Sequence, residues 1–356
     1  ERVSVEAKSG TSVRLTIDRD VQWVAQNAIS QAVSASRAQS GTVIVMDPKT
    51  GAILAQASAP TFDPSVSSSI TLEKLKNPAV QEVYEPGSTG KVITVAAALQ
   101  EGLVTPESVF TIPYKMKVAD QYFHDHEKHP TQRLTTAGVL AVSSNTGSIQ
   151  IGQKLGKDVL YDYLRKFGIG ESTNSKLPGE SAGILHPVKN WSGTSLPTIA
   201  FGQGYSLTAM QATSVFATIA NDGVRVSPSI LAGVVDESGK YTPAKPNNSV
   251  RVLSSQTATD MRAMMESVVS SNGTAPSAAI SGYRIAGKTG TANRFNTACK
   301  CYSGYTASFI GFAPADAPKY VISVTIQDPK GMHWGGALAG PVFKKVMSFV
   351  LQSERV

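Results

Sequence analysis

Residues 85–100 read EPGSTGKVITVAAALQ, and the run after Lys91 is almost entirely apolar. Gly102 follows it in the position of a C-cap residue, so the sequence predicts a buried helix over 91–100. Ser88 is expected at the first turn of this helix, where free backbone N–H groups and the positive end of the helix dipole stabilise negative charge. Because Lys91 follows three residues later, its amine is expected on the same face as the Ser88 hydroxyl.

This serine and this lysine form a candidate catalytic pair. A serine hydroxyl is a weak nucleophile unless a neighbouring group takes its proton. Lys91 can take that proton only if its pKa falls from the usual value of about 10.4, through burial or a second nearby cation. The apolar helix supplies the burial, and Lys288 is the candidate for the cation. We therefore predict that Ser88 is a nucleophile and that Lys91 is its base.

A second motif, Ser143-Ser144-Asn145, follows the apolar stretch 137–142 and is expected in a loop between helices. The Ser143 hydroxyl can relay a proton between Ser88, Lys91 and a leaving amine, which makes it the third catalytic candidate. The Asn145 amide offers a donor and an acceptor that suit a substrate peptide bond. On its own this motif is typical of a helix cap, and it gains its catalytic interpretation from the other two motifs.

A third motif, Lys288-Thr289-Gly290-Thr291, is expected at the end of a strand. Side chains alternate there, so Lys288 and Gly290 share one face, and Thr289 and Thr291 share the other. Lys288 and the threonine hydroxyls can bind a substrate carboxylate, while Gly290 leaves room for an extended substrate to pair with the strand edge. The backbone N–H groups of Ser88 and Thr291 are the candidate oxyanion hole.

Strand patterns at both ends of the chain flank a mainly helical middle. Near the N-terminus, strands are predicted at 11–17, 42–46 and 52–57, with a helix capped by Asp18 at about 20–38. The middle, 106–223, is expected to contain helices at 136–142, 157–167 and 206–221. Near the C-terminus, strands are predicted at 284–291, 305–313 and 320–327, and a helix at 341–352. One antiparallel sheet built from both ends, with helices packed on it, gives an α/β (α+β) fold.

The composition is that of a folded protein with a basic surface. Hydrophobic residues make up 41% and charged residues 17% of the 356 residues, which excludes global disorder. The net charge of +7 comes from scattered Lys and Arg, without a basic stripe or zinc-ligand spacing, so we exclude nucleic-acid binding. The sequence has no run of about 18 apolar residues. It starts at Glu1 without a signal-like stretch, and we interpret it as an ectodomain whose N-terminal anchor has been removed.

The three motifs, in this order, resemble those of class B penicillin-binding proteins of the division-type FtsI group. Glu85–Ser88 resembles that family's lead-in to the nucleophile, and Leu177–Gly183 and Phe201–Gly204 resemble two further landmarks. The resemblance covers nearly the whole chain. It implies the penicillin-binding protein and serine β-lactamase-like transpeptidase fold, with a five-stranded antiparallel sheet flanked by helices and a mainly helical subdomain.

The resemblance also implies where the domains lie. Residues 1–17 are expected to be the remnant of a truncated upstream region, and residues 18–356 to be the transpeptidase domain. Within that domain, the sheet is expected from about 18–60 and 280–356, and the helical part from about 85–280.

The implied activity is that of a peptidoglycan D,D-transpeptidase. Such an enzyme cross-links stem peptides through an acyl-enzyme, here on Ser88, and β-lactams inhibit it by acylating the same serine. Neither a cofactor nor a metal is implied. Because the chain contains no glycosyltransferase domain, we expect a membrane SEDS glycosyltransferase and division proteins as partners. The implied location is the bacterial cell envelope, on the extracytoplasmic side of the plasma membrane, with a septal role favoured over elongation.

Two groups of residues invite other interpretations. The spacing of His124, His126 and His129 fits neither H-E-x-x-H nor a Cys/His finger, and the family commonly carries an Asp- and His-containing stretch before its S-x-N motif. We therefore predict a polar network there and no metal site. Glu180 lies near where a class A β-lactamase places its deacylating glutamate, but its neighbours resemble the penicillin-binding protein landmark, so we predict no deacylating role.

The chain has two cysteines, Cys299 and Cys301, and the sequence leaves open whether they are free thiols or a small local disulfide. They follow the Lys288–Thr291 motif closely, so a disulfide there would stiffen a loop at the rim of the site.

Two other functions also stay open. A β-lactamase or a D,D-carboxypeptidase would use the same residues with water as the acceptor. A β-lactam sensor would be acylated without turnover. The sensor is disfavoured because such domains resemble the smaller class D lactamases and lack the 87 residues that precede Ser88 here.

Overall fold

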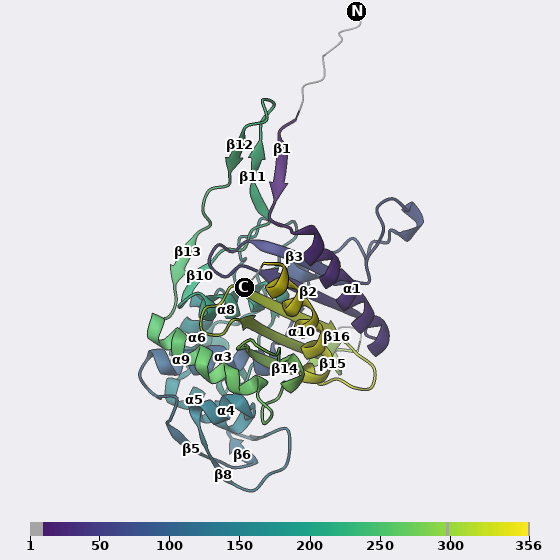
Figure 1. Ribbon diagram of the computed structural model, residues 1–356. Helices are drawn as coiled ribbons and strands as arrows, with labels where there is room; N and C mark the ends of the chain where they lie inside the picture. The colour runs from purple at the N-terminus through teal and green to yellow at the C-terminus, as the bar shows by residue number, and fades with distance from the viewer. Residues whose placement is uncertain (1–9, 297–298, 355–356) are drawn as a thin grey trace, which may run out of the picture.

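A five-stranded antiparallel sheet of order β14-β15-β16-β2-β3 forms the centre of the molecule (Figure 1). The computed structural model describes residues 10–296 and 299–354. The strands of this sheet span β2 (Ser40–Met46), β3 (Ile53–Ala59), β14 (Ala286–Asn296), β15 (Cys301–Ala313) and β16 (Tyr320–Gln327). Because β16 pairs with β2, the two ends of the chain meet in the middle of the sheet. The predicted fold class is thereby confirmed.

Helices cover both faces of this sheet. The first and last helices, α1 (Arg19–Ser36) and α10 (Gly335–Ser353), pack together on one face and bury its apolar side chains. As predicted, Asp18 caps α1, accepting hydrogen bonds from the backbone N–H groups of Asp20 and Val21. On the other face lies α8 (Ala209–Ala220), in which every residue is buried.

The remaining helices form a layer around α3 (Lys91–Gln100), which is the helix predicted from the opening stretch. Its neighbours are α4 (Thr136–Ala141), α5 (Asn145–Leu155), α6 (Lys157–Lys166) and α9 (Ser255–Glu266). Two short helices, α2 (Pro78–Gln81) and α7 (Ser195–Ala200), complete this part. The first eight residues of α3 are all buried, so this helix can place a side chain deep in the protein.

The middle of the chain is less purely helical than predicted. Two strand pairs lie ahead of α4: β5 (Val109–Ile112) pairs with β8 (Gln132–Thr135), and between them the hairpin strands β6 (Lys115–Val118) and β7 (Gln121–His124) pair with each other. Two-residue strands β4 (Val83–Tyr84) and β9 (Leu207–Thr208) pair near the start of α8, although they are far apart in the chain. The helices predicted at 136–142, 157–167 and 206–221 are present as α4, α6 and α8, and the short strands were not predicted.

Two predicted boundaries near the C-terminus were wrong. Strand β14 continues to Asn296, so the Lys288–Thr291 motif lies inside the strand and not at its end. The last helix begins at Gly335, and Pro341 lies within it instead of at its first turn. A proline inside a helix removes one backbone hydrogen bond, which is tolerated here because the surrounding turn is packed against the sheet and against α1.

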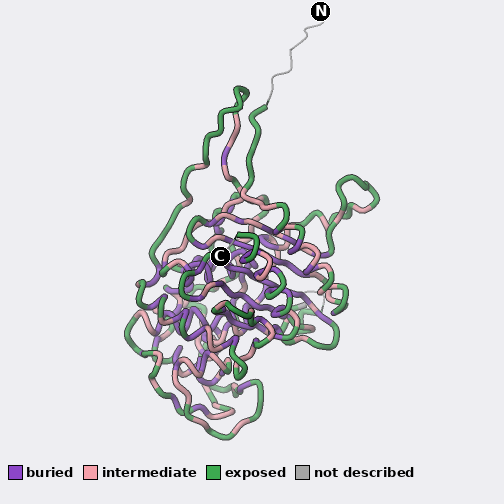
Figure 2. The backbone as a smooth tube through the Cα atoms, viewed as in Figure 1, coloured by how far each residue is buried: buried purple, intermediate pink, exposed green. Residues whose placement is uncertain are grey.

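A narrow three-stranded sheet projects from the body of the molecule (Figure 1). Strand β1 (Ser12–Leu15) pairs with β11 (Leu231–Val235), which pairs in turn with β12 (Tyr241–Pro243). Below it, β10 (Val224–Val226) pairs with β13 (Ser249–Arg251). Figure 2 shows this projection as mostly exposed, whereas the central sheet and α3 are buried. The predicted strand at 11–17 thus exists, but it lies outside the central sheet.

Candidate active site

The turn that carries Ser88 is a 3₁₀ segment, Gly87–Gly90, which leads directly into α3. We expected Ser88 in the first turn of the α-helix, and it lies one turn ahead of it. A second loop fixes this turn, because the Gly87 N–H donates to the carbonyl of Gly202 at 2.8 Å. Gly202 has a φ of +96°, and a Cβ there would lie 1.8 Å from the Gly87 oxygen. Only glycine allows the two backbones to approach this closely.

Lys91 is the first residue of α3 and is fully buried. Its Nζ donates hydrogen bonds to the Ser143 carbonyl at 2.5 Å, to Asn145 Oδ1 at 2.7 Å and to Ser143 Oγ at 3.2 Å. Burial lowers the pKa of Lys91 to about 7, although the charge of Asp125 opposes the shift. A substantial fraction of this lysine is therefore the neutral amine near neutral pH, which is what a base requires.

Lys288, in β14, approaches the Ser143 hydroxyl as well. It is fully buried, and its Nζ donates to Ser143 Oγ at 2.9 Å. Burial, and then the charge of Lys91, hold the pKa of Lys288 well below its ordinary value. With both amines donating to it, the Ser143 oxygen has its lone pairs occupied and its own hydrogen free to point elsewhere. Ser143 itself has a φ of +61°, an uncommon conformation for a serine.

Asp125 holds the turn that contains Ser143. This buried carboxylate accepts hydrogen bonds from the Ser144 hydroxyl at 2.7 Å and from the backbone N–H groups of Asn145 at 2.5 Å and Thr146 at 2.9 Å. It therefore satisfies free donors at the start of α5, where a negative charge is favourable. The polar network predicted for the histidine-rich stretch is present. In the described parts of the chain, no three His, Cys, Asp or Glu residues are placed to hold a metal ion.

Strand β14 presents its side chains alternately, as predicted. Thr291 Oγ1 accepts from the backbone N–H of Gly335 at 3.1 Å, at the start of α10. Thr289 Oγ1 lies 2.8 Å from Thr274 Oγ1, so this hydroxyl is paired within the protein. Lys288 Nζ points toward Ser143 and also lies 3.4 Å from Thr289 Oγ1. The structure therefore brings Lys288 to Ser143 and leaves Thr291 on the side of α10.

Gly290 is closely packed within the protein itself. A Cβ at this position would lie 2.3 Å from Ser308 Oγ, 2.9 Å from the Pro86 carbonyl oxygen and 3.0 Å from Thr89 Cγ2. Its close neighbours are thus β15 and the turn that carries Ser88, and room for a substrate backbone at this position stays a prediction. Because β14 is the edge strand of the sheet, this packing places the Ser88 turn directly beside an unpaired strand edge.

Similarity to known proteins agrees with this geometry. The sequence matches the penicillin binding protein transpeptidase domain over residues 41–348. The chain belongs to this transpeptidase family. It is 40% identical to penicillin-binding protein PbpB of Mycolicibacterium smegmatis, over 99% of this chain and 56% of that protein. It is 34% identical to peptidoglycan D,D-transpeptidase FtsI of Escherichia coli, over 99% of this chain and 58% of that protein.

Solved structures agree as well. The transpeptidase chain matches penicillin binding protein 3 from Mycobacterium tuberculosis, complexed with aztreonam, with a TM-score of 0.94 and 39% identity, covering 100% of this chain and 82% of that one. A peptidoglycan synthetase from Bifidobacterium adolescentis matches with a TM-score of 0.89 and 35% identity, covering 98% and 62%. The family and fold predicted from the motifs are confirmed. The chain spans about half the length of the curated relatives it matches.

Sequence reasoning missed the role of Glu85 in this transpeptidase domain. Its Oε1 accepts from the Gly204 N–H at 2.9 Å and from the Tyr302 hydroxyl at 3.1 Å. Burial raises the pKa of the Glu85 carboxyl, and both hydrogen bonds oppose the shift. The sequence signal was present, because Glu85 and Gly204 belong to two of the family landmarks, but nothing in the sequence joins them. Glu85 therefore links the turn that carries Ser88 to the Phe201–Gly204 loop and to β15.

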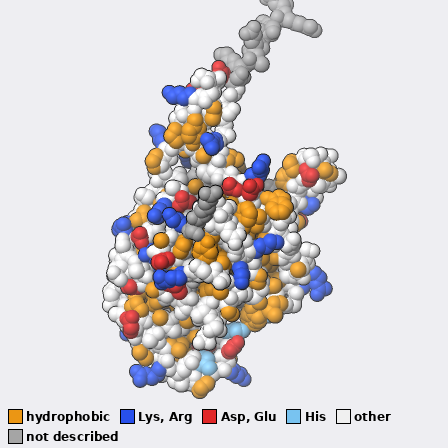
Figure 3. Space-filling view, in the orientation of Figure 1, with side chains coloured by type: hydrophobic (Ala, Val, Ile, Leu, Met, Phe, Trp, Pro, Cys, Tyr) orange, Lys and Arg blue, Asp and Glu red, His pale blue; other side chains and the backbone are white. Residues whose placement is uncertain are grey.

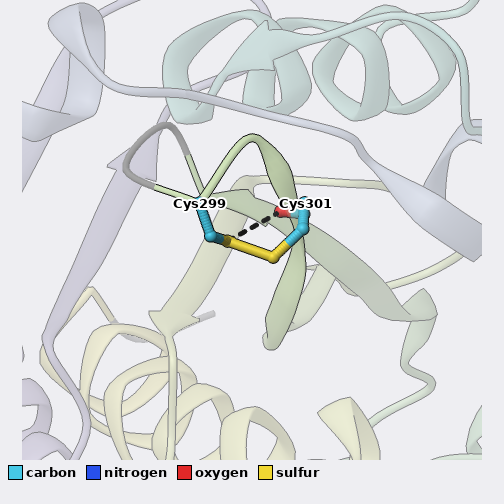
Figure 4. Close-up of a disulfide and its surroundings, with 2 residues drawn as sticks. All are labelled: Cys299 and Cys301. Carbon is cyan, nitrogen blue, oxygen red and sulfur yellow. Dashed lines mark hydrogen bonds between the residues drawn. A yellow bond between two sulfur atoms is a disulfide. The ribbon is translucent and has the colours of Figure 1, made fainter.

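At the start of β15 in the β14–β15 hairpin, a disulfide joins Cys299 to Cys301, with the Cα atoms 5.2 Å apart (Figure 4). Of the two alternatives left open by the sequence, the structure selects the local disulfide. Nearby, Arg294 Nη2 lies 3.4 Å from Glu82 Oε1, which adds a second link between this hairpin and the chain ahead of Ser88. The hairpin is thus fastened to the lead-in of the serine turn.

Glu180 has a structural role in the transpeptidase fold. Its carboxylate accepts from the Ser172 hydroxyl at 2.7 Å, the Thr173 N–H at 2.8 Å and the Ser175 hydroxyl at 3.1 Å. These bonds order the loop that follows α6. Its carboxylate is thus engaged within this loop, and the absence of a deacylating role stays a prediction.

The surface shows no dominant charged patch on the face seen in Figure 3, where Lys and Arg side chains are dispersed. This distribution matches the scattered basic residues of the sequence. Among the helices in residues 10–296 and 299–354, none combines the length and the apolar character needed to cross a bilayer.

Proposed function

We propose that this chain is the catalytic domain of a peptidoglycan D,D-transpeptidase, in which Ser88 is the nucleophile, Lys91 the base and Ser143 the proton relay. The observation that carries the proposal is the buried Lys91 amine, which is hydrogen-bonded to Ser143 and Asn145 while Lys288 reaches Ser143 from the edge strand. Desolvated amines around a serine hydroxyl, next to a nucleophile turn, suit proton transfer at neutral pH.

In the first half-reaction, Ser88 Oγ attacks the carbonyl carbon of the D-Ala-D-Ala peptide bond, and Lys91 takes the hydroxyl proton. The tetrahedral oxyanion is stabilised by the backbone N–H groups of Ser88 and Thr291. When the C–N bond breaks, Ser143 passes a proton to the nitrogen of the departing D-Ala and is reprotonated from Lys91. The products are free D-Ala and an ester between Ser88 and the donor stem peptide.

In the second half-reaction, an amine of another stem peptide attacks this ester. Its proton returns through Ser143 and Lys91 to Ser88 Oγ as the ester C–O bond breaks, which leaves a new peptide cross-link and the free enzyme. Both half-reactions use the same groups in reverse order, so no further base is required.

Substrate binding is assigned to Asn145, Lys288, Thr289, Gly290 and Thr291. Asn145 holds the donor peptide bond. Of the two threonines, Thr291 is the better candidate for the terminal carboxylate, since the Thr289 hydroxyl is paired with Thr274. Lys288 adds positive charge nearby whenever it is protonated. The unpaired edge of β14 gives an extended stem peptide a backbone to pair with.

β-Lactams are proposed as covalent inhibitors that acylate Ser88, by analogy with the relative solved with aztreonam and with ampicillin. A septal role is proposed from the similarity to FtsI. The proposed location is the extracytoplasmic side of the bacterial plasma membrane, where a membrane SEDS glycosyltransferase would supply the glycan strands.

The test is to incubate the protein with a fluorescent penicillin and follow the adduct over hours, in parallel with Ser88→Ala. Ser195→Ala is a matched control, because Ser195 lies at the start of α7, is partly exposed, and forms local hydrogen bonds with Ser192 through its hydroxyl. A stable adduct in the wild type and the control, absent from Ser88→Ala, supports the transpeptidase. Transfer of a D-Ala-D-Ala peptide to an amine acceptor, followed by mass spectrometry, then separates it from a sensor.

The same experiment can overturn the proposal. Rapid loss of the adduct with release of hydrolysed drug would identify a β-lactamase. Release of D-Ala without cross-linked product at high amine concentration would identify a D,D-carboxypeptidase. Full labelling of Ser88→Ala would show that the nucleophile is assigned wrongly.

A further inference from the structure

His129 lies outside the three motifs and is linked through Asp125 to the turn 143–146. Its Nε2 is 3.0 Å from Asp125 Oδ2, and its Nδ1 is 2.7 Å from the Pro130 carbonyl oxygen. The imidazole side chain is only 17% exposed and that of Asp125 only 8%. Asp125 is the carboxylate that holds the start of α5, so His129 contacts the site through a single intermediate residue.

Both ring nitrogens of His129 face oxygen atoms that act as acceptors. An ionised carboxylate and a peptide carbonyl can only accept, and a neutral imidazole carries a single N–H. One of the two short contacts would then join two acceptors. The imidazolium, which has an N–H on each nitrogen, satisfies both. The hydrogen bond to Pro130, and then that to Asp125, raise the pKa of His129 above its ordinary value, which agrees with this geometry.

The other titratable groups around this pair are few in the described residues. Tyr114 presents its ring edge-on to His129, with centroids 6.0 Å apart, and its carbonyl accepts from the Asp125 N–H. The His124 ring also lies near Tyr114, with centroids 5.6 Å apart, and contacts the Asp125 carbonyl through its Nδ1. Lys91 feels the charge of Asp125, which raises its pKa against the larger effect of burial. The charge of the Asp125 carboxylate therefore acts on two titratable groups, the His129 imidazole and the Lys91 amine.

We propose that His129 is a positioning residue for acylation: as an imidazolium it fastens Asp125 to the turn 143–146 and offsets the negative charge that would otherwise keep a proton on Lys91. This inference rests on the proposed function, since it assigns Lys91 as the base. Without the cation, Asp125 acts on Lys91 with its full charge, and the amine becomes harder to deprotonate.

The sign of the pH effect follows from the direction of the shift. His129 is protonated at pH values below its pKa in the folded protein, and its stabilising hydrogen bonds are lost as the pH rises through that value. Lys91 must lose its proton to act, so acylation rises as the pH passes about 7. A rise in pH therefore deprotonates Lys91, which favours acylation, and also deprotonates His129, which disfavours it. Removing the histidine charge should move the rising part of the plot of acylation rate against pH, the rising limb, to higher pH.

The experiment measures the second-order rate of acylation of the full chain by a fluorescent penicillin between about pH 5.5 and about pH 9. In His129→Gln, the amide keeps a donor near the Nε2 position but no charge. We expect the rising limb to move up by about half a unit to one unit, with acylation at neutral pH about three- to tenfold slower and near normal above the limb. His129→Lys restores a cation and should return the limb toward the wild-type position.

A purely structural role gives a different result. It lowers the rate equally at every pH and leaves the limb in place, and that result would overturn the proposal. The matched control is His186→Gln, because this exposed histidine lies in the loop ahead of α7 and should leave the profile unchanged.

A second measurement uses the wild-type protein alone and does not depend on acylation. Nitrogen-15 spectra of the wild-type imidazoles report how many ring nitrogens of His129 carry a proton. We expect two protonated nitrogens to a pH clearly above 6.5, and a ring that is singly protonated below that value would contradict the inference. Because this readout is independent of Ser88, it separates a failure of the His129 proposal from a failure of the proposed function.

Discussion

The interior and the far end of the β14–β15 hairpin differ in how their polar groups are held. In the interior, the fully buried Lys288 donates to Ser143 Oγ, to which the equally buried Lys91 also donates. At the far end, Phe295 is 52% and Tyr302 58% exposed, and the hairpin is fastened by single contacts and a disulfide. Electrostatic interactions strengthen as water is excluded, so the interior can shift pKa values strongly while the far end contributes ordinary surface energies.

The largest expected effect comes from breaking the interior. Lys91→Met keeps the length of the side chain and removes the base, so acylation by a fluorescent penicillin should fall by about a thousandfold or more. Acylation within tenfold of the wild-type rate would contradict the assignment of Lys91 as the base.

The same variant tests the burial of the amine through stability. The pKa of Lys91 is about 7 in the folded protein and about 10.4 in an unfolded chain. Between these values the unfolded state binds more protons, so the free energy of unfolding of the wild type should rise with pH. Urea unfolding at about pH 7 and about pH 9 should show a smaller rise in Lys91→Met than in the wild type. Equal slopes would contradict the lowered pKa.

The next effect concerns the close contact behind the serine turn. Gly202→Ala introduces a Cβ 1.8 Å from the Gly87 oxygen at a φ of +96°, so we expect a loss of stability of about 3 kcal/mol or more, with slower acylation. Gly102→Ala is the control, because Gly102 also has a positive φ, +65°, but nothing lies within 4 Å of the added atom. It should lose only about 1 kcal/mol by urea unfolding and keep its acylation rate. Equal losses would show that the contact with Gly87 is unimportant.

A smaller effect is expected at the far end of the hairpin. Tyr302→Phe removes the hydroxyl that donates to Glu85, so acylation should slow by about two- to fivefold and the free energy of unfolding should fall by about 1 kcal/mol. Tyr241→Phe is matched to it, since the Tyr241 hydroxyl donates to the Ala232 carbonyl in the projecting sheet. The control should cost similar stability and leave acylation unchanged. A Tyr302→Phe variant that is acylated at the control's rate would argue against a link from the hairpin to the serine turn.

The smallest effect is expected from the disulfide. Replacing both Cys299 and Cys301 by serine opens a very short loop, so the free energy of unfolding should change by less than about 2 kcal/mol. Acylation should stay within about twofold of the wild type, because Tyr302 and Arg294 still link the hairpin to the serine turn. A larger loss of acylation than in Tyr302→Phe would show that the disulfide matters more to the Ser88 turn than the hydrogen bond between Tyr302 and Glu85 does.

The sequence predicted the helices whose apolar run and capping residue lie within the same short segment. Helix α3 begins and ends where the apolar run 91–100 does, and α1 begins at the residue after its cap, Asp18. By contrast, α5 contains Gly147 and Gly152, which disfavour a helix locally. Gly152 is required because a Cβ there would lie 2.5 Å from Ala200 Cβ in α7. That requirement is tertiary and leaves no local signal.

The site was predictable to the same extent. The three motifs predicted Ser88, Lys91, Ser143 and Lys288 as candidates, and the structure brings the last three of these together. The far end of β14 was missed because its residues 292–296, ANRFN, lack the alternation of a half-buried strand. The contributions of Asp125 and Glu85 depend on partners 20 and 119 residues away in the chain, so only the folded structure could reveal them.

The projecting sheet gives the domain a defined mechanical connection to whatever precedes Ser12. Strand β1 is joined to β11 by an antiparallel ladder from Ser12 to Leu15, whose bonds run across the strands. A pull along β1 therefore loads these bonds in shear, together, instead of opening them one after another. Past this ladder, the chain is held to β3 by Thr16 and Asp18, which donate to the carbonyls of Ile53 and Leu54, before it enters α1 on the central sheet. The ladder to β11 and the bonds to β3 would therefore share the tension, on the side of the sheet away from its β14 edge.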